Sequence, residues 1–148
     1  MEPVWRDRSD FIIAADISSQ GAALAREQLW ARQISEVQFE LCCIPFFVYD
    51  LALGDVVETA AEGPRKYVIS RVVEPSGRYV FRVWFGESIH PPNEVAGSLH
   101  MFGALLEWSS RHLLAVDTRD AAHAQVIADF LADRQTRGNL IYETGKTA

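Results

Sequence analysis

Apolar and polar residues alternate with a period of two along most of the first half of the chain. This period places successive side chains on opposite faces of a β-strand. Turn-forming residues at 35–36, 62–64 and 75–77 separate the alternating runs. We therefore predict a β-rich half, forming a meander or a small open barrel, with strands over residues 27–34, 37–44, 55–60, 66–74 and 78–85.

Two of the apolar runs suggest a position within a sheet. In the run 78–85, Tyr79 and Phe81 lie on one face and Val80 and Trp84 on the other, so both faces carry apolar side chains. A strand of this kind is expected in the middle of a sheet. The apolar run at 11–17 predicts a further strand at a sheet edge.

After residue 91 the apolar spacing changes to that of an α-helix. Asn93 can cap a first helix, in which Val95, Leu99, Phe102 and Leu106 recur at intervals of four, three and four residues. The uninterrupted spacing predicts that this helix continues as far as Leu106.

A second helix is predicted to begin after Asp120, a residue that favours the N-cap position. Gly138 fits the position just beyond its C-terminal end, where a left-handed backbone is common. Buried strands at 113–117 and 139–144 flank the helix. With the strand at 78–85, the order is β-α-β-α-β, which predicts helices packed on one face of a sheet.

These elements predict the α+β class. We expect an N-terminal segment, 1–26, that contains the edge strand, followed by a single domain over residues 27–148. This domain is divided into a β-rich half, 27–86, and a helix-containing half, 91–145. A chain of 148 residues is long enough to bury one core.

Charge and cysteine content narrow the functional classes. The acidic residues among the first ten are not typical of a secretory signal, and the apolar stretches are shorter than the roughly 20 residues that cross a membrane. Cys42 and Cys43 are adjacent in a predicted strand, where a disulfide between them would be strained. We expect free thiols, one in the core and one partly exposed, in a cytoplasmic protein that does not bind membranes.

A net charge of −6 disfavours nucleic acid as a partner, because binding to phosphates requires positive charge on one face. The opposing hypothesis needs Arg65, Arg71, Arg78 and Arg82 on one exposed face. Arg71 and Arg82 are expected in neighbouring strands, so such a face is conceivable from the sequence, although the net charge opposes it.

Candidate catalytic groups are scattered and form no known motif. We predict no catalytic residue, no metal ligand and no cofactor. An alternative function is a small-molecule-binding or enzymatic site between the β-rich half and the helices, with contributions from His90, His112 or Cys43. His123, on the apolar side of its helix, is expected to be a buried, hydrogen-bonded histidine.

The absence of a catalytic pattern favours a non-catalytic protein-binding domain, for example an immunity or antitoxin-like protein that neutralises a basic toxin. Aromatic and acidic residues follow Pro45 with no intervening basic residue, a combination that is typical of interfaces. The sequence leaves the oligomeric state open. The predicted partner-binding residues are Phe47, Tyr49, Asp50, Asp55, Glu58 and Glu62.

Two strings in the sequence resemble those of a bacterial family known only as a domain of unknown function. They are IPFFVYDLALGDVVE at residues 44–58 and VVEPSGRYVFRV at residues 72–83. The resemblance extends over roughly residues 29–145. It implies a shared fold and a bacterial source, and it supplies no catalytic residues.

Overall fold

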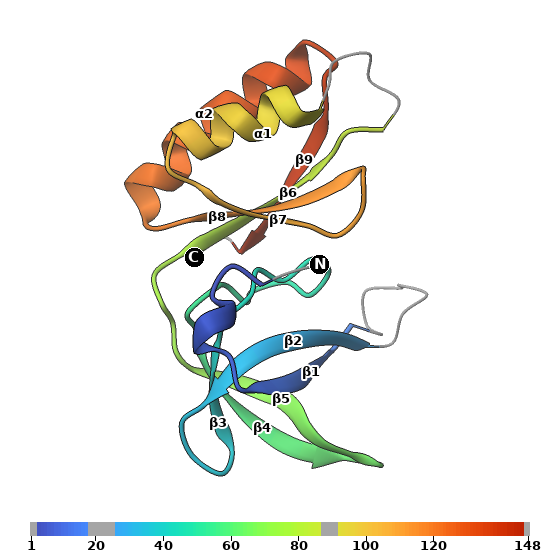
Figure 1. Cartoon of the computed structure of the whole chain (residues 1–148), viewed down its shortest axis with the longest axis vertical. Helices are drawn as coiled ribbons and strands as arrows, with labels where there is room; N and C mark the ends of the chain where they lie inside the picture. Colours follow the sequence, from blue (N-terminus) through green and yellow to red (C-terminus); the bar gives the residue numbers. More distant parts are fainter. Residues whose placement is uncertain (1–2, 18–25, 87–91, 147–148) are drawn as a thin grey trace.

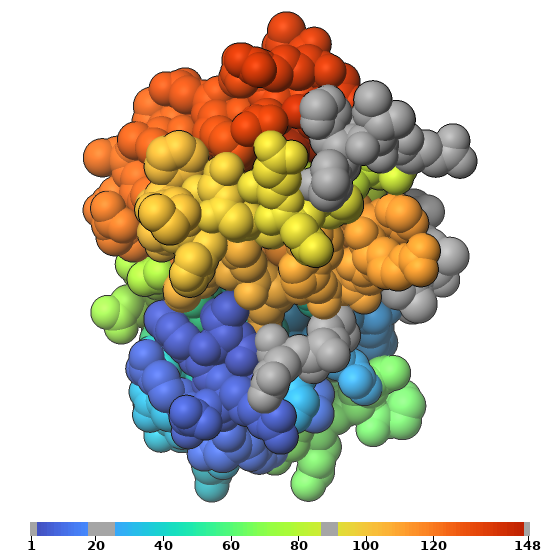
Figure 2. Space-filling model, turned by 45° about the horizontal axis from the view of Figure 1, so that its top comes forward, coloured from blue at the N-terminus to red at the C-terminus, as the bar shows by residue number. Residues whose placement is uncertain are grey.

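The structure, a computed structural model, describes residues 3–17, 26–86 and 92–146. Over these residues it contains two stacked units: a closed β-barrel, and a four-stranded sheet covered by two helices (Figure 1). The predicted α+β class is confirmed, with a β-rich half followed by a helix-containing half. In the space-filling view the two units meet along a furrow (Figure 2).

The first strand closes the barrel. It pairs antiparallel with the second strand along its whole length, and it meets the fifth strand in parallel at Ala14 and Val68. The predicted strand at 11–17 therefore exists, but its edge position is wrong. Without it, the strands on either side would each expose unpaired backbone groups. The barrel strands are β1 (Phe11–Asp16), β2 (Arg26–Gln33), β3 (Gln38–Leu41), β4 (Val56–Glu62) and β5 (Arg65–Glu74).

Alternating side chains fill the interior of the barrel, as the period of two predicts. Leu29 and Ala31 of β2 are buried, and the exposed Trp30 lies between them. Phe39 of β3 is fully buried, and its ring centroid lies 4.9 Å from that of Phe11 and 5.6 Å from that of Tyr67. Rings from three strands thus pack in one core.

The second unit has a ferredoxin-like βαββαβ order. Its strands are arranged β7-β8-β6-β9, and each neighbouring pair is antiparallel. The predicted central position of the strand at 78–85 is confirmed, because β6 has a neighbour on both sides. The elements are β6 (Tyr79–Trp84), α1 (Pro92–Met101), β7 (Leu105–Trp108), β8 (Leu113–Thr118), α2 (Ala121–Thr136) and β9 (Ile141–Lys146).

Both helices cover one face of this sheet, as predicted (Figure 1). In the described part of the chain, neither is long and apolar enough to cross a membrane. The Asp120 side chain caps α2 by accepting the N–H of His123 at 2.8 Å, and Gly138 follows the helix with a φ of 78°. The core between helices and sheet contains Phe81, Val83, Val95, Leu99, Leu114, Val116, Ile127 and Leu131.

Two predictions about element boundaries are wrong. The predicted meander joins the strands on either side of residues 75–77 in one sheet, but β5 belongs to the barrel and β6 to the second sheet. Between β8 and β9 a strand can bury both of its apolar faces, which a position at the barrel rim would not allow. The first helix includes Asn93 and ends at Met101 rather than at Leu106. Gly103, with a φ of 86°, reverses the chain there, and β7 follows.

Two irregular segments fill the space between the units. One is the N-terminal segment with the short helix η1 (Arg6–Arg8), where the Trp5 N–H donates to the Cys42 carbonyl at 3.1 Å. The other is the long connection between β3 and β4, residues 42–55, which we call the junction loop. Its apolar side chains meet the sheet face opposite the helices, in a cluster of Ile44, Phe46, Ala52, Val80, Leu113 and Ala115.

Candidate functional site

The predicted binding residues do not form one surface. Three of them lie on the junction loop, and two of these three contact β9. One lies in the interior, and two lie on a barrel strand. The three on the junction loop are Phe47, Tyr49 and Asp50; the buried one is Asp55; the two on strand β4 are Glu58 and Glu62.

Tyr49 is exposed, yet its side chain is held in place from two sides. Its hydroxyl donates to the Glu143 carboxylate, whose oxygens lie 2.8 and 2.9 Å away. This hydrogen bond raises the pKa of the Tyr49 hydroxyl. The buried guanidinium of Arg82 lies against the ring, 4.9 Å from its centroid, in a cation–π contact. Tyr49 therefore presents a fixed aromatic face to solvent.

Asp50 has a positive φ of 65°, and no other non-glycine residue in the described ranges has one. Asp tolerates this left-handed conformation better than most residues. Its backbone N–H donates to the Gly145 carbonyl at 2.8 Å, which fixes the loop against β9. The carboxylate is exposed and pairs with no cation within the described chain. We refer to Phe47, Tyr49, Asp50 and Glu143 as the Tyr49 surface.

Asp55 is fully buried, so the prediction that it contacts a partner is wrong. Its carboxylate receives the Lys146 ammonium at 3.0 and 3.1 Å. It also accepts the backbone N–H groups of Ala52 at 2.9 Å and Ser76 at 2.8 Å. Asp55 therefore connects the junction loop, the link between the units and β9, and its role is structural.

Glu58 and Glu62 remain near the surface of the barrel, but each has a basic partner. Glu58 contacts Arg71 at 3.2 Å, and Glu62 contacts Arg26 at 3.0 Å. Sequence reasoning placed no basic residue beside them because these arginines lie on other strands. The pairing offsets the negative charge on which their predicted role depended.

The junction loop is held by a carboxylate from the barrel and a guanidinium from the sheet. Glu27 at the start of β2 accepts the N–H groups of Phe46, Phe47 and Val48 at 2.7, 3.0 and 2.9 Å. Arg82 of β6 donates to the carbonyls of Phe47 and Val48. The backbone of one short segment is thus satisfied from both units.

Glu107 on β7 provides a third polar link. Its two carboxylate oxygens accept the backbone N–H groups of Val4 and Ile44. Only 5% of the residue is exposed. Burial raises the pKa of the Glu107 carboxyl to about 7, with a smaller contribution from the negative charge of Glu27, while the two N–H donors act in the opposite direction.

These three junction residues were not predicted as site residues. Two of them stand between apolar neighbours in a strand, Arg82 in Phe-Arg-Val and Glu107 in Leu-Glu-Trp, whereas Glu27 stands between Arg26 and Gln28. That pattern is the available signal.

A cavity of about 260 Å³ lies between the barrel and the second sheet. The alternative hypothesis placed a site between the β-rich half and the helices, but the helices cover the opposite face of the sheet. Of its proposed residues, Cys43 lines the cavity, His112 is exposed in the β7–β8 hairpin, and His90 lies outside the described residues. The cavity is lined by residues including Arg26, Glu27, Trp30, Cys43, Phe46, Phe47 and Glu107.

Both cysteines are free and buried, so the predicted partial exposure of one is wrong. Burial raises the pKa of the Cys42 thiol to about 11 and that of Cys43 well above its ordinary value. A cysteine acts as a nucleophile through its thiolate. Both thiols therefore remain protonated near neutral pH, and neither is activated.

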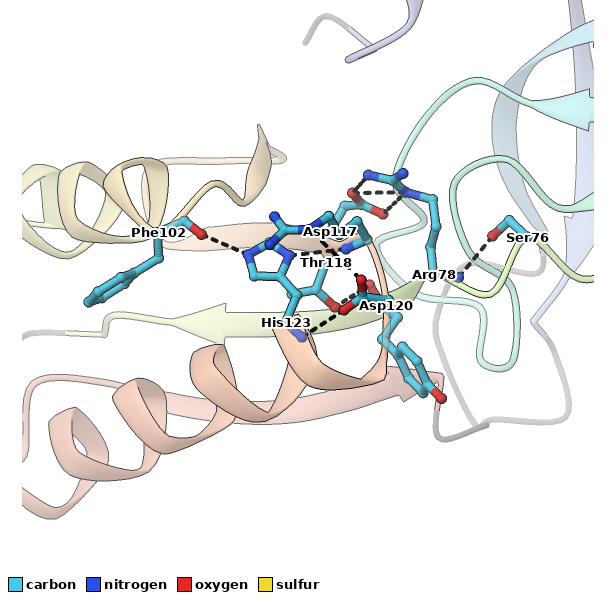
Figure 3. Close-up of polar contacts among 9 residues, drawn as sticks. Ser76, Arg78, Phe102, Asp117, Thr118, Asp120 and His123 are labelled. Atoms are coloured by element: carbon cyan, nitrogen blue, oxygen red, sulfur yellow. Dashed lines mark hydrogen bonds and ion pairs between the residues drawn. The ribbon is translucent and has the colours of Figure 1, made fainter.

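The proposed arginine face for nucleic acid does not form. Arg82 is 1% exposed, and it belongs to a different sheet from Arg71. Arg78 pairs with Asp117, with its Nε 2.9 Å from one carboxylate oxygen (Figure 3). The guanidinium groups of Arg78 and Arg82 thus bind other groups of the protein and are not free to contact phosphates.

His123 has the structural role that its position predicts. Its Nδ1 accepts the backbone N–H of Arg119 at 3.1 Å, and its Nε2 lies 2.8 Å from the Phe102 carbonyl, to which it donates (Figure 3). The ring joins the turn after α1 to the start of α2. In the described ranges, no group of three or more His, Cys, Asp or Glu side chains is arranged to hold a metal ion.

Comparison with known proteins gives a family and a fold. The model of the domain of unknown function DUF4265 matches residues 27–142. No curated protein matches the sequence. A crystal structure described as a hypothetical protein from Neisseria gonorrhoeae is similar, with a TM-score of 0.76 and 17% identity over 91% of this chain and 93% of the other. At this identity the similarity shows a shared fold.

Proposed function

This chain belongs to the DUF4265 family, and we propose that it is a non-catalytic domain that binds a basic partner protein through the Tyr49 surface. The observation that carries the proposal is an exposed, immobilised aromatic ring beside an unpaired carboxylate. Tyrosine is enriched among the residues that dominate binding energy. An unpaired surface carboxylate attracts a positively charged partner.

The fixed geometry of Tyr49 favours binding. A flexible side chain loses roughly 0.5–1.5 kcal/mol of conformational freedom when an interface immobilises it. The Glu143 and Arg82 contacts already restrict this ring, so less freedom remains to be lost. The half-buried Phe47 extends the apolar part of the surface.

The charge of the chain indicates the class of partner. A net charge of −6 and the exposed Asp50 favour a basic protein by charge complementarity and accelerate association at low salt. A basic toxin domain has this chemistry, so the domain would act as an immunity or antitoxin-like protein. Free thiols are compatible with action in the reducing cytoplasm. The protonated state of both thiols supports a non-catalytic role.

The test is affinity purification from a bacterial lysate with the full chain as bait. The amount of partner protein recovered is compared between the native chain and the variants Tyr49→Ala and Asp50→Asn. Asparagine tolerates the left-handed backbone at position 50 and removes only the charge. We expect a co-purifying basic protein whose recovery falls at least about tenfold with Tyr49→Ala, the range of a hot-spot residue, and less with Asp50→Asn.

The matched control is Glu62→Gln, which removes the same charge from the barrel surface, beside Arg26. It should leave recovery of the partner unchanged. Equal recovery with all four proteins would contradict the proposal. So would a partner whose binding depends on Glu62 and not on Tyr49.

A further inference from the structure

The cavity between the units has walls of two chemical kinds. Its volume, about 260 Å³, lies just below the range of roughly 300–1,000 Å³ that is typical of small-molecule pockets. One part of the wall is carboxylate, from Glu27 of β2 and Glu107 of β7. Another part is aromatic, from Trp30 of β2 and from Phe46 and Phe47 of the junction loop.

The carboxylate wall has negative charge and hydrogen-bonding capacity left over. Each Glu107 oxygen accepts one backbone N–H, and a carboxylate oxygen has two lone pairs. Oε2 of Glu27 also accepts a single N–H. Arg82 offsets part of the charge of Glu27 across the junction loop. Arg26 also lines the cavity, but it forms an ion pair with Glu62 at 3.0 Å. No basic side chain of the described chain forms an ion pair with Glu107.

The aromatic wall would attract the same kind of ligand. A cation is stabilised over the face of an aromatic ring, and tryptophan is the strongest of these rings. Trp30 is 36% exposed, so a large part of its surface is free for contact. A metal ion prefers several converging oxygen, nitrogen or sulfur ligands, and such a group is not found in the described residues.

We propose that this cavity binds a small organic cation, a protonated amine attached to an apolar group. The ammonium would donate hydrogen bonds to Glu107 and Glu27. The apolar group would lie against Trp30 and Phe46. Phe47 borders both this cavity and the Tyr49 surface. The variants that test the two proposals change other residues, so either proposal can fail without the other.

The probe is benzylammonium, and its neutral counterpart is benzyl alcohol, which has a similar shape. Titration of the full chain at pH 8, followed by NMR of the tryptophan indole N–H groups, would give both dissociation constants. We expect benzylammonium to bind at least about tenfold more tightly, with the largest shift at Trp30, because charge-assisted hydrogen bonds are stronger than neutral ones. Equal binding of the two compounds would overturn the proposal.

Two variants test the two walls. Glu107→Gln removes the charge and should reduce benzylammonium affinity about tenfold with little change for benzyl alcohol. Trp30→Leu changes an exposed position, so this variant should fold even if Glu107→Gln destabilises the junction. It should lower the affinity for both compounds, because it removes part of the aromatic wall. Tyr49→Ala is the control and should change neither affinity. Unchanged binding by Trp30→Leu would overturn the proposal.

The pH dependence provides an independent readout. Glu107 faces Glu27 of β2, Cys43 of the junction loop and Asp117 of β8, and its carboxyl has a pKa of about 7. Benzylammonium should therefore bind about tenfold more tightly at pH 8 than at pH 6, as Glu107 ionises. Glu107→Gln should abolish this difference. A difference that persists in Glu107→Gln would exclude Glu107 as the ammonium partner.

Discussion

The interiors of the two units differ from the layer between them. The barrel and the helix-covered sheet each enclose apolar side chains, such as Phe39 in the first and Leu114 in the second. The layer between them also contains charged groups that are at most 7% exposed. These are Glu27, Asp55, Arg82, Glu107, Asp117 and Lys146.

The difference has a physical consequence for how the units are held together. Apolar burial stabilises a fold with little directional preference. A buried charge requires a partner at a defined position, because an uncompensated one is costly. We therefore expect the two cores to supply most of the stability. The charged layer should determine how the barrel is placed on the sheet, and it should be the part that responds to pH.

The largest expected effect comes from a cavity in an apolar interior. Phe39→Ala removes a fully buried ring that contacts Phe11 and Tyr67. The free energy of unfolding should fall by about 3–5 kcal/mol, measured by urea denaturation. Because no titratable group is changed, the loss should be the same at pH 5 and pH 8. A loss that depends strongly on pH would contradict the expectation that only the charged layer, and not the apolar cores, responds to pH.

A somewhat smaller effect, about 3 kcal/mol, is expected when the charged layer loses one member of a buried ion pair. Lys146→Met leaves the fully buried Asp55 carboxylate without its cation. The double variant with Asp55→Asn should recover at least about 1 kcal/mol relative to the sum of the single losses.

The matched control for this pair is Arg71→Met, which breaks the exposed contact with Glu58. Its loss should be below about 0.5 kcal/mol, since solvent screens exposed pairs. If the exposed and buried pairs give equal losses, the layer between the units is not the sensitive region that the comparison describes.

The smallest of the three effects is a pH dependence from Glu107. Its folded-state pKa of about 7 lies above the ordinary value of 4.5, so the folded protein binds this proton more tightly than the unfolded chain does. Stability from this group is therefore present at low pH and is lost as pH rises toward 7. Between pH 5 and pH 8 the loss is on the order of 2 kcal/mol.

Urea denaturation of the native protein and of Glu107→Gln at both pH values measures this contribution. The difference between pH 5 and pH 8 should be smaller in Glu107→Gln by that amount. Identical pH dependence in both proteins would show that the Glu107 carboxyl does not titrate differently in the folded and unfolded states.

Much of the fold could be predicted from local patterns. The period of two identified the barrel strands, and the Asp120 cap with Gly138 beyond the helix end identified α2. The four-residue strand β7 was missed because Leu106 continues the helical spacing of α1. The turn at Gly103 outweighs that spacing, because the chain must reverse to pair β7 with β8.

The candidate sites could be predicted only in part. Tyr49 and Asp50 were identified from their aromatic and acidic character, and the structure places them together on the surface. Asp55 lies five residues from Asp50 and has the same side chain, yet it is fully buried. Its environment depends on Lys146, which is 91 residues away along the chain. Such a distant partner has no local signal.

The amino-acid order alone determined most of the segments that become strands and helices, because hydrophobic period, caps and turns act over a few residues; β7 is the exception. It also determined the acidic, aromatic character of the junction loop. Only the tertiary structure decided which sheet β6 joins, which charged side chains are buried and where a cavity lies. These features arise when two separately patterned surfaces meet, and a polar position in a strand has the same local sequence whether water or another unit covers it.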